Sequence, residues 1–117
     1  MSGLQREDYV LKQARAIAAM LARIAGLRLG GETEKARVEL EQCYTLLLGS
    51  RAALIRQVDS STAAALLGSP EKIHAFADLL HEEAEQEKDQ RRSAFLRGRA
   101  VELEQHLERK IDHDAGS

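Results

Sequence analysis

The sequence has no tryptophan, one cysteine, one proline and four other aromatic residues. A single cysteine, Cys43, cannot form an intrachain disulfide. No uncharged apolar run reaches the roughly 18 residues of a membrane span, so we expect no transmembrane helix. Residues 1–8 are polar and show no secretory pattern, so a reducing, cytoplasmic location is expected.

The sequence also lacks an excess of charge of one sign. It has 17 Lys and Arg against 19 Asp and Glu, and the net charge of -2 provides no global attraction to nucleic acid or anionic lipid. Basic residues concentrate at positions 91, 92, 97 and 99, with Phe95 the one aromatic residue among them. We predict that these arginines pair with the acids of residues 82–89 and that no nucleic acid is bound; a nucleic-acid binder would instead show affinity that falls steeply with salt.

What is abundant is alanine and leucine at helical spacing. In residues 9–29 apolar side chains recur every three or four positions, the Gly30-Gly31 pair then interrupts the pattern, and a second stripe follows in residues 32–48. These stripes consist of Val10, Ala14, Ile17, Leu21 and Ile24, and of Ala36, Leu40, Cys43, Tyr44 and Leu47. Residues 5–48 are therefore predicted to form a helical hairpin whose first helix contacts more than one neighbour.

The rest of the chain continues the all-helical pattern. Short apolar segments in residues 50–68 predict a compact connector of short helices. Ser69-Pro70 is a strong start signal for another helix, since Ser is a preferred N-cap and Pro suits the first helical position. The buried stripe of this helix is predicted to be Ile73, Phe76, Ala77, Leu80 and Ala84. That of the following segment is predicted to be Ala94, Phe95, Gly98 and Val101 and, less regularly, Leu103, Leu107 and Ile111.

Residues 85–93 contain no apolar side chain, and this gap has two interpretations. Either the chain turns near Lys88 to Gln90 and residues 70–112 form a second hairpin, or one long helix crosses solvent, since no Gly or Pro forces a break. We favour the turn, because a single helix of that length is rare in a chain this short.

The segment Gly31-Glu32-Thr33-Glu34-Lys35-Ala36, with Leu40 and the small residue Cys43 after it, resembles the turn and second helix of a tetratricopeptide repeat. Arg23, Ile24 and Leu48-Gly49 depart from the pattern of that repeat, and residues 70–110 match it more loosely, with Ala100 as the small packing residue. Over most of the chain, the order of Arg6-Glu7-Asp8-Tyr9-Val10-Leu11, the first hairpin, a short-helix connector and an acidic helix after Pro70 resembles an uncharacterised bacterial family of short helical proteins of unknown function. These resemblances imply a repeat-like helical fold in a bacterial cytoplasm. They imply no activity and no catalytic residues.

The pattern that most resembles a set of metal ligands is Glu71-x-x-His74 followed by Asp78-x-x-His81. Carboxylate and imidazole three residues apart share a helix face, as in carboxylate-bridged di-metal bundles. Those bundles draw ligands from four helices, whereas both pairs here lie on one, so an exposed acidic face is the preferred interpretation and a small metal-binding bundle the alternative. Cys43 lies on a buried stripe, where a free thiol is usually protonated and inert.

We therefore expect a single all-α domain over residues 1–117, with four to six helices in helical hairpins joined by a short-helix connector, and no catalytic residue or cofactor. About three repeats are normally needed for a stable array, and this chain supplies at most two, so a homodimer is predicted. The residues expected at its interface are Ile17, Leu21, Ile24, Ile73, Phe76 and Leu80. The predicted function is a noncatalytic protein-interaction or scaffold module, with the groove between the hairpins receiving a partner helix or peptide.

Overall fold

The computed structural model describes the backbone of residues 2–116 and the side chains of residues 8–109. The described residues contain α-helices and one turn of 3₁₀ helix, and no strand, which confirms the predicted all-α class. The elements are α1 (Ser2–Leu29), α2 (Thr33–Leu48), the 3₁₀ turn η1 (Gly49–Arg51), α3 (Ala52–Gln57), α4 (Ser60–Leu67), α5 (Pro70–Gln86) and α6 (Gln90–Gly116).

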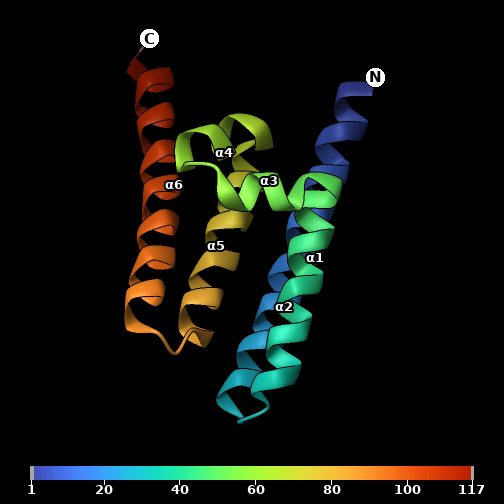
Figure 1. Cartoon of the computed structure of the whole chain (residues 1–117). Coiled ribbons are helices and arrows are strands. Elements are labelled where there is room, and N and C mark those ends of the chain that lie inside the picture. The colour runs from blue at the N-terminus through green and yellow to red at the C-terminus, as the bar shows by residue number, and fades with distance from the viewer. Residues whose placement is uncertain (1, 117) are drawn as a thin grey trace.

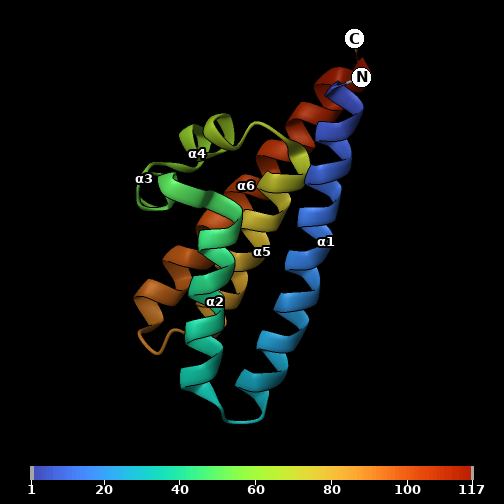
Figure 2. The same cartoon turned by 90° about the vertical axis from the view of Figure 1, so that its right-hand side faces the viewer.

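Two long hairpins make up most of the molecule (Figure 1). Helices α1 and α2 form the first, α5 and α6 form the second, and the short helices α3 and α4 connect them. Helix α5 lies at the centre and contacts α1, α2, α4 and α6. Seen from the side, α2, α3 and α4 lie on one side of α5, α1 lies on the other, and α6 crosses behind it (Figure 2).

Local sequence explains where the helices begin and end. Gly31 adopts a φ of +85°, which favours glycine, and the Glu32 amide donates to the Leu27 carbonyl at 2.9 Å, which closes the end of α1. The predicted start at Ser69-Pro70 is confirmed, since the Ser69 hydroxyl accepts a hydrogen bond from the Lys72 amide at 3.2 Å.

The polar gap forms a turn, as favoured from the sequence. Helix α5 ends at Gln86 and α6 begins at Gln90. The Asp89 carboxylate accepts a hydrogen bond from the Arg91 amide at 3.0 Å, and the Ser93 hydroxyl donates to the Ala84 carbonyl at 2.8 Å across the hairpin. A polar side chain at the N-terminus of α6 thus satisfies backbone groups that a continuous helix would have paired internally.

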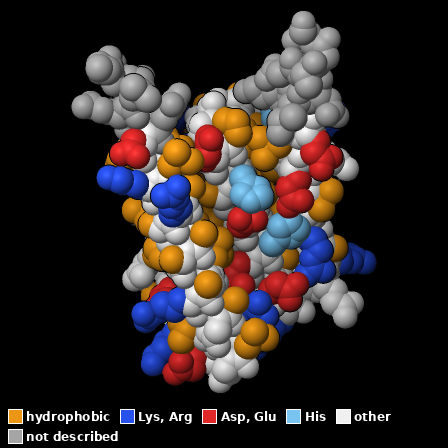
Figure 3. All heavy atoms as spheres, turned by 180° about the vertical axis from the view of Figure 1, so that it is seen from behind, with side chains coloured by type: hydrophobic (Ala, Val, Ile, Leu, Met, Phe, Trp, Pro, Cys, Tyr) orange, Lys and Arg blue, Asp and Glu red, His pale blue; other side chains and the backbone are white. Residues whose placement is uncertain are grey.

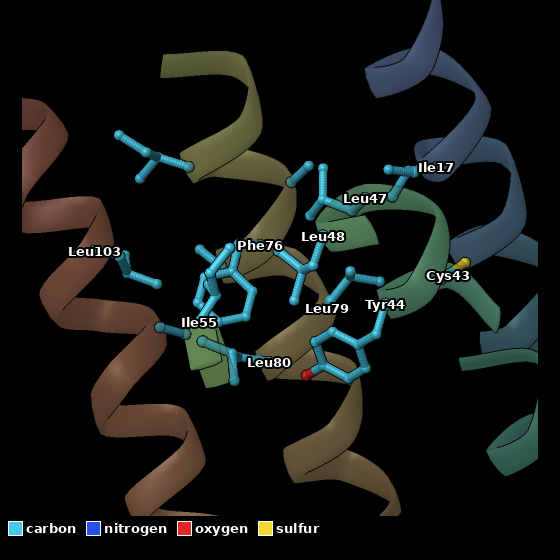
Figure 4. Packing of buried hydrophobic residues seen from close by; sticks show 14 of the residues in the cluster. Ile17, Cys43, Tyr44, Leu47, Leu48, Ile55, Phe76, Leu79, Leu80 and Leu103 are labelled. Atoms are coloured by element: carbon cyan, nitrogen blue, oxygen red, sulfur yellow. The ribbon is translucent and has the colours of Figure 1, made fainter. Parts of the chain in front are cut away.

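The core lies where α5 meets α1, α2, α3 and α6 (Figure 4). The Tyr44 and Phe76 rings meet edge to face, with centroids 6.2 Å apart, and Leu79 and Leu103 are fully buried beside them. Five of the six residues expected at a dimer interface belong to this core, each at most 2% exposed: Ile17, Ile24, Ile73, Phe76 and Leu80. They pack within one chain and are not accessible to a second copy, whereas Leu21 is partly exposed.

The predicted buried face of α6 is wrong at its start and correct further along, where Leu103 is buried and Leu107 packs against the core; Ile111 lies outside the residues whose side chains are described. Phe95 is 61% exposed and Val101 is also exposed, while Leu96 and Leu103 are buried. The true stripe includes Arg99, only 7% exposed, and a charged residue at a core position misled the periodicity argument.

Candidate functional site

A charged groove lies between the two hairpins at one end of their contact. It has a volume of about 690 Å³ and lies between α2 and the α5–α6 turn. Basic and acidic side chains line it in equal numbers, and Leu40 is the one large apolar residue in the lining. The predicted groove is therefore present, but its character is polar, so a purely apolar partner helix would not match it.

A second cavity, of about 370 Å³, lies between α3 and α6 and has a partly apolar lining. We call it the arginine pocket: Ala53, Leu80, Phe95 and Leu96 line it together with Arg56, Glu83, Arg92 and Arg99. Three of these residues, Arg56, Glu83 and Arg92, also line the charged groove. The two cavities are therefore neighbours along one surface, one end partly apolar and the other charged.

Glu83 is the centre of a polar network at this junction. The Tyr44 hydroxyl donates to the Glu83 carboxylate at 2.6 Å, and Arg56 and Arg92 approach the same carboxylate at 3.4 and 3.5 Å. The Arg56 guanidinium lies 3.9 Å from the Tyr44 ring centroid and pairs with Glu41 at 2.8 Å. Burial raises the pKa of Tyr44 well above its usual value, and the adjacent Glu83 carboxylate adds to the shift.

Arg99 stabilises the end of α3. Its guanidinium donates to the carbonyls of Arg56, of Val58 at 2.6 Å and of Ile55 at 3.3 Å, where the negative end of the helix dipole lies. The guanidinium carbon also lies 5.5 Å from the Phe76 ring centroid. Within the described residues Arg99 forms no ion pair and its Nε has no hydrogen-bond partner, and burial lowers its pKa.

The predicted pairing of the arginines with the acids of residues 82–89 is confirmed in part. Arg92 pairs with Glu87 at 3.3 Å as well as with Glu83, and Arg97 pairs with Glu85 at 3.0 Å. Arg99 does not follow this prediction, because its guanidinium turns inward to α3. The arginine pocket itself was missed, although the spacing Leu96–Arg99–Leu103 is a helical stripe that could have indicated an inward arginine.

The alternative metal ligands diverge into two separate pairs. His74 and Asp78 approach each other at 3.6 Å, while His81 contacts Glu104 of α6 at 2.6 Å. Glu71 is exposed, the His74 side chain is 67% exposed, and burial raises the pKa of Asp78. Within residues 8–109 no three His, Cys, Asp or Glu side chains cluster as metal ligands would.

Cys43 has the surroundings expected for an inert thiol. It is fully buried, and its Sγ lies 3.7 Å from the Met20 Sδ of α1. Burial raises the pKa of the Cys43 thiol, so the reactive thiolate is disfavoured at neutral pH.

One face of α1 is only partly covered within the described chain, where Leu21 packs against the core. We call it the α1 face; its residues recur every three or four positions, none is charged and each is partly or fully exposed: Leu11, Ala14, Ala18, Leu21, Ala22, Ala25 and Leu29. Leu29 is 77% exposed. Seen from behind, apolar side chains run down one side of the molecule, and histidines and carboxylates lie beside them (Figure 3).

Comparison of the chain with protein-family models, with curated proteins and with solved structures finds no match. Among the described residues, no helix combines the length and the apolar character needed to cross a membrane. Function must therefore be inferred from the two cavities and the α1 face.

Proposed function

We propose that this protein is a noncatalytic protein-interaction module whose groove between the hairpins receives a segment of a partner protein. The observation that carries the proposal is the arginine pocket, a partly apolar cavity beside a charged groove. Protein interfaces commonly combine a small apolar centre with a polar rim, and their binding energy concentrates in side chains that fill such pockets.

The exposure of Phe95 supports this proposal. A large aromatic side chain that is 61% exposed on the lining of a cavity leaves apolar area in contact with water. A partner side chain that packs against Phe95 and Leu96 would remove that area from water. The cavity volume of about 370 Å³ suits one or two side chains, and the charged groove would position the flanking residues.

A peptide library displayed on phage tests the proposal. Peptides selected on the wild-type chain are expected to lose at least about tenfold in affinity for Ala53→Trp, because an exposed alanine on the lining is replaced by a side chain that fills the cavity. Ala65→Trp, at an exposed position of α4 outside both cavities, is the matched control. Peptides that bind both variants equally, or a library that yields no ligand, would refute the proposal.

We further propose that the protein is a homodimer and that the α1 face is its contact surface. The face is apolar along its length, and Lys12 and Arg15 are exposed beside it. Two copies that meet along this face would bury the apolar rows of both. The relation to tetratricopeptide repeats and the bacterial, cytoplasmic location belong to this proposal and rest on the sequence alone.

Light scattering coupled to size-exclusion chromatography measures the oligomeric state directly. A dimer is expected at micromolar concentration, and Ala18→Glu should convert it to a monomer by placing a charge at the centre of the apolar row. Ala16→Glu, at an exposed position off that row, should remain dimeric. A monomeric wild-type chain at that concentration would exclude the dimer.

A further inference from the structure

The two hairpins are joined by the chain at one end and are free at the other. The connector of η1, α3 and α4 runs from the end of α2 to the start of α5. The turn of the first hairpin, at residues 30–32, and the turn of the second, at residues 87–89, both lie at the opposite end of the molecule (Figure 1). The hairpins are therefore two arms that are covalently linked at one end, and side-chain contacts hold their free ends together.

The contact between the arms changes from apolar to charged toward the free ends. Helix α5 makes this contact with α1 and α2. Phe76 and Leu79 of α5 are fully buried, and the Phe76 ring meets the Tyr44 ring of α2 edge to face. One turn further along α5, Glu82 is only 7% exposed, although a carboxylate is rarely buried without a partner. The position that would continue the apolar contact therefore carries a charge.

The partner of Glu82 is Arg28, in the last turn of α1. The guanidinium donates from Nε to one carboxylate oxygen at 2.8 Å and from Nη2 to the other at 3.2 Å, and the Gln86 side chain donates to the same carboxylate at 3.2 Å. This planar, two-point pairing fixes the orientation of the two side chains as well as their separation. We call it the Arg28–Glu82 clasp. The Tyr44–Glu83 hydrogen bond also joins the arms, but Tyr44 lies in the C-terminal part of α2, closer to the connector.

The clasp contributes orientation more than stability. Removing two charges from water costs free energy that offsets most of their attraction, so an apolar pair of similar volume would stabilise the contact as well or better. An apolar contact is non-directional, however, and packed helices scatter by about 15–20° around a preferred crossing angle. A bidentate ion pair at the free ends restricts that angle.

We propose that the Arg28–Glu82 clasp sets the angle between the two hairpins and, with it, the width of the charged groove. Arg28 itself lines that groove, together with Leu40 of α2 and with Gln86 and Lys88 at the α5–α6 turn. Because these walls belong to different arms, a rotation of the arms about the connector changes the groove. Arg28 and Glu82 are therefore positioning residues, whatever segment the groove receives.

Spin labels on the two arms measure this angle by pulsed electron paramagnetic resonance. Lys35 of α2 and Gln90 of α6 are exposed near the free ends and lie outside the groove lining, so both are replaced by labelled cysteines in a full-length Cys43→Ala background. The intact clasp should give one narrow distance distribution.

Glu82→Gln removes the charge and keeps the shape of the side chain. It should broaden the distribution and lengthen the mean by up to about 6 Å, because a rotation of about 15° moves the end of a helix about 25 Å long by that amount. An unchanged distribution would overturn the inference.

Arg23→Gln is the matched control. Arg23 pairs with Glu39 at 3.0 Å, but both residues belong to the first hairpin, so the loss of this ion pair should leave the distance between the arms unchanged. Equal broadening by Arg23→Gln and Glu82→Gln would overturn the inference, since any lost surface charge would then have the same effect.

An apolar replacement separates positioning from stability. The double variant Arg28→Met/Glu82→Leu should have a urea midpoint at least equal to that of the wild type, and yet give the broad distribution. A narrow distribution in this variant, or a lower midpoint, would overturn the inference. The distances are measured without a partner, so failure of the clasp leaves the interaction module standing, and failure of the peptide selection leaves the clasp standing.

Discussion

Replacing Arg99 by alanine should destabilise the protein by about 2–4 kcal/mol, although arginine is usually a surface residue. The substitution removes hydrogen bonds to the carbonyls of Ile55, Arg56 and Val58. A net hydrogen bond is worth about 1 kcal/mol and one from a charged group about 1.5–3 kcal/mol, while carbonyls left unpaired cost more. The cost of burying the guanidinium offsets part of the gross sum over three such bonds, which brings the expected loss below that sum.

The matched control is Arg97→Ala, two positions earlier on α6. Arg97 is half exposed and pairs with Glu85 at the surface, so its removal should change stability by less than about 1 kcal/mol. Urea unfolding followed by circular dichroism at 222 nm measures both variants, and the midpoint should shift with little change in slope. A domain of this size is commonly stable by 5–15 kcal/mol, so Arg99→Ala should still fold.

A small effect of Arg99→Ala, similar to that of Arg97→Ala, would refute the assignment of Arg99 as the cap of α3. Arg99→Lys gives a further check, because an ammonium group can reach one of the carbonyls but cannot bridge all three. Its stability should lie between those of the wild type and of Arg99→Ala.

Three further outcomes are expected. Gly31→Ala should cost about 1 kcal/mol, because alanine is strained at a φ of +85°, whereas Gly26→Ala, inside α1 with open space at the Cβ position, should stabilise by up to about 1 kcal/mol; thermal unfolding compares them. Because burial raises the pKa of Tyr44, its phenolate absorbance at 295 nm should appear above the ordinary value near 10, and Tyr44→Phe should remove that late step. The folded state holds this proton more tightly than the unfolded state, so stability should fall as pH rises through that region. Cys43 should react slowly with Ellman's reagent in the native protein and rapidly in guanidinium chloride, and rapid native reaction would contradict its burial.

The helices were predictable because their signals are local. The break at Gly30-Gly31, the cap at Ser69 and the polar residues around Lys88 act on their own neighbours in the chain, and each marks an observed boundary. The stripe of α5 was equally clear, since Ile73, Phe76 and Leu80 recur at helical spacing without a charge among them.

The candidate site was not predictable in the same way. The arginine pocket depends on the orientation of α6: the periodicity placed Phe95 on the buried side of that helix, whereas the folded chain buries Arg99 and leaves Phe95 exposed. An arginine becomes favourable inside only when acceptors such as the carbonyls at the end of α3 are close, and their position is a property of the folded chain.

What the sequence alone determined is the all-helical class, the hairpin breaks and the supply of apolar stripes, because these follow from backbone preferences and spacing along one chain. Only the tertiary structure decided which apolar stripes are buried against other helices of the same chain. Ile17 and Phe76 meet their partners inside one chain, whereas most of the α1 face and Phe95 do not. Periodicity specifies which side of a helix is apolar, but the neighbour that covers it is chosen by packing among all the helices at once.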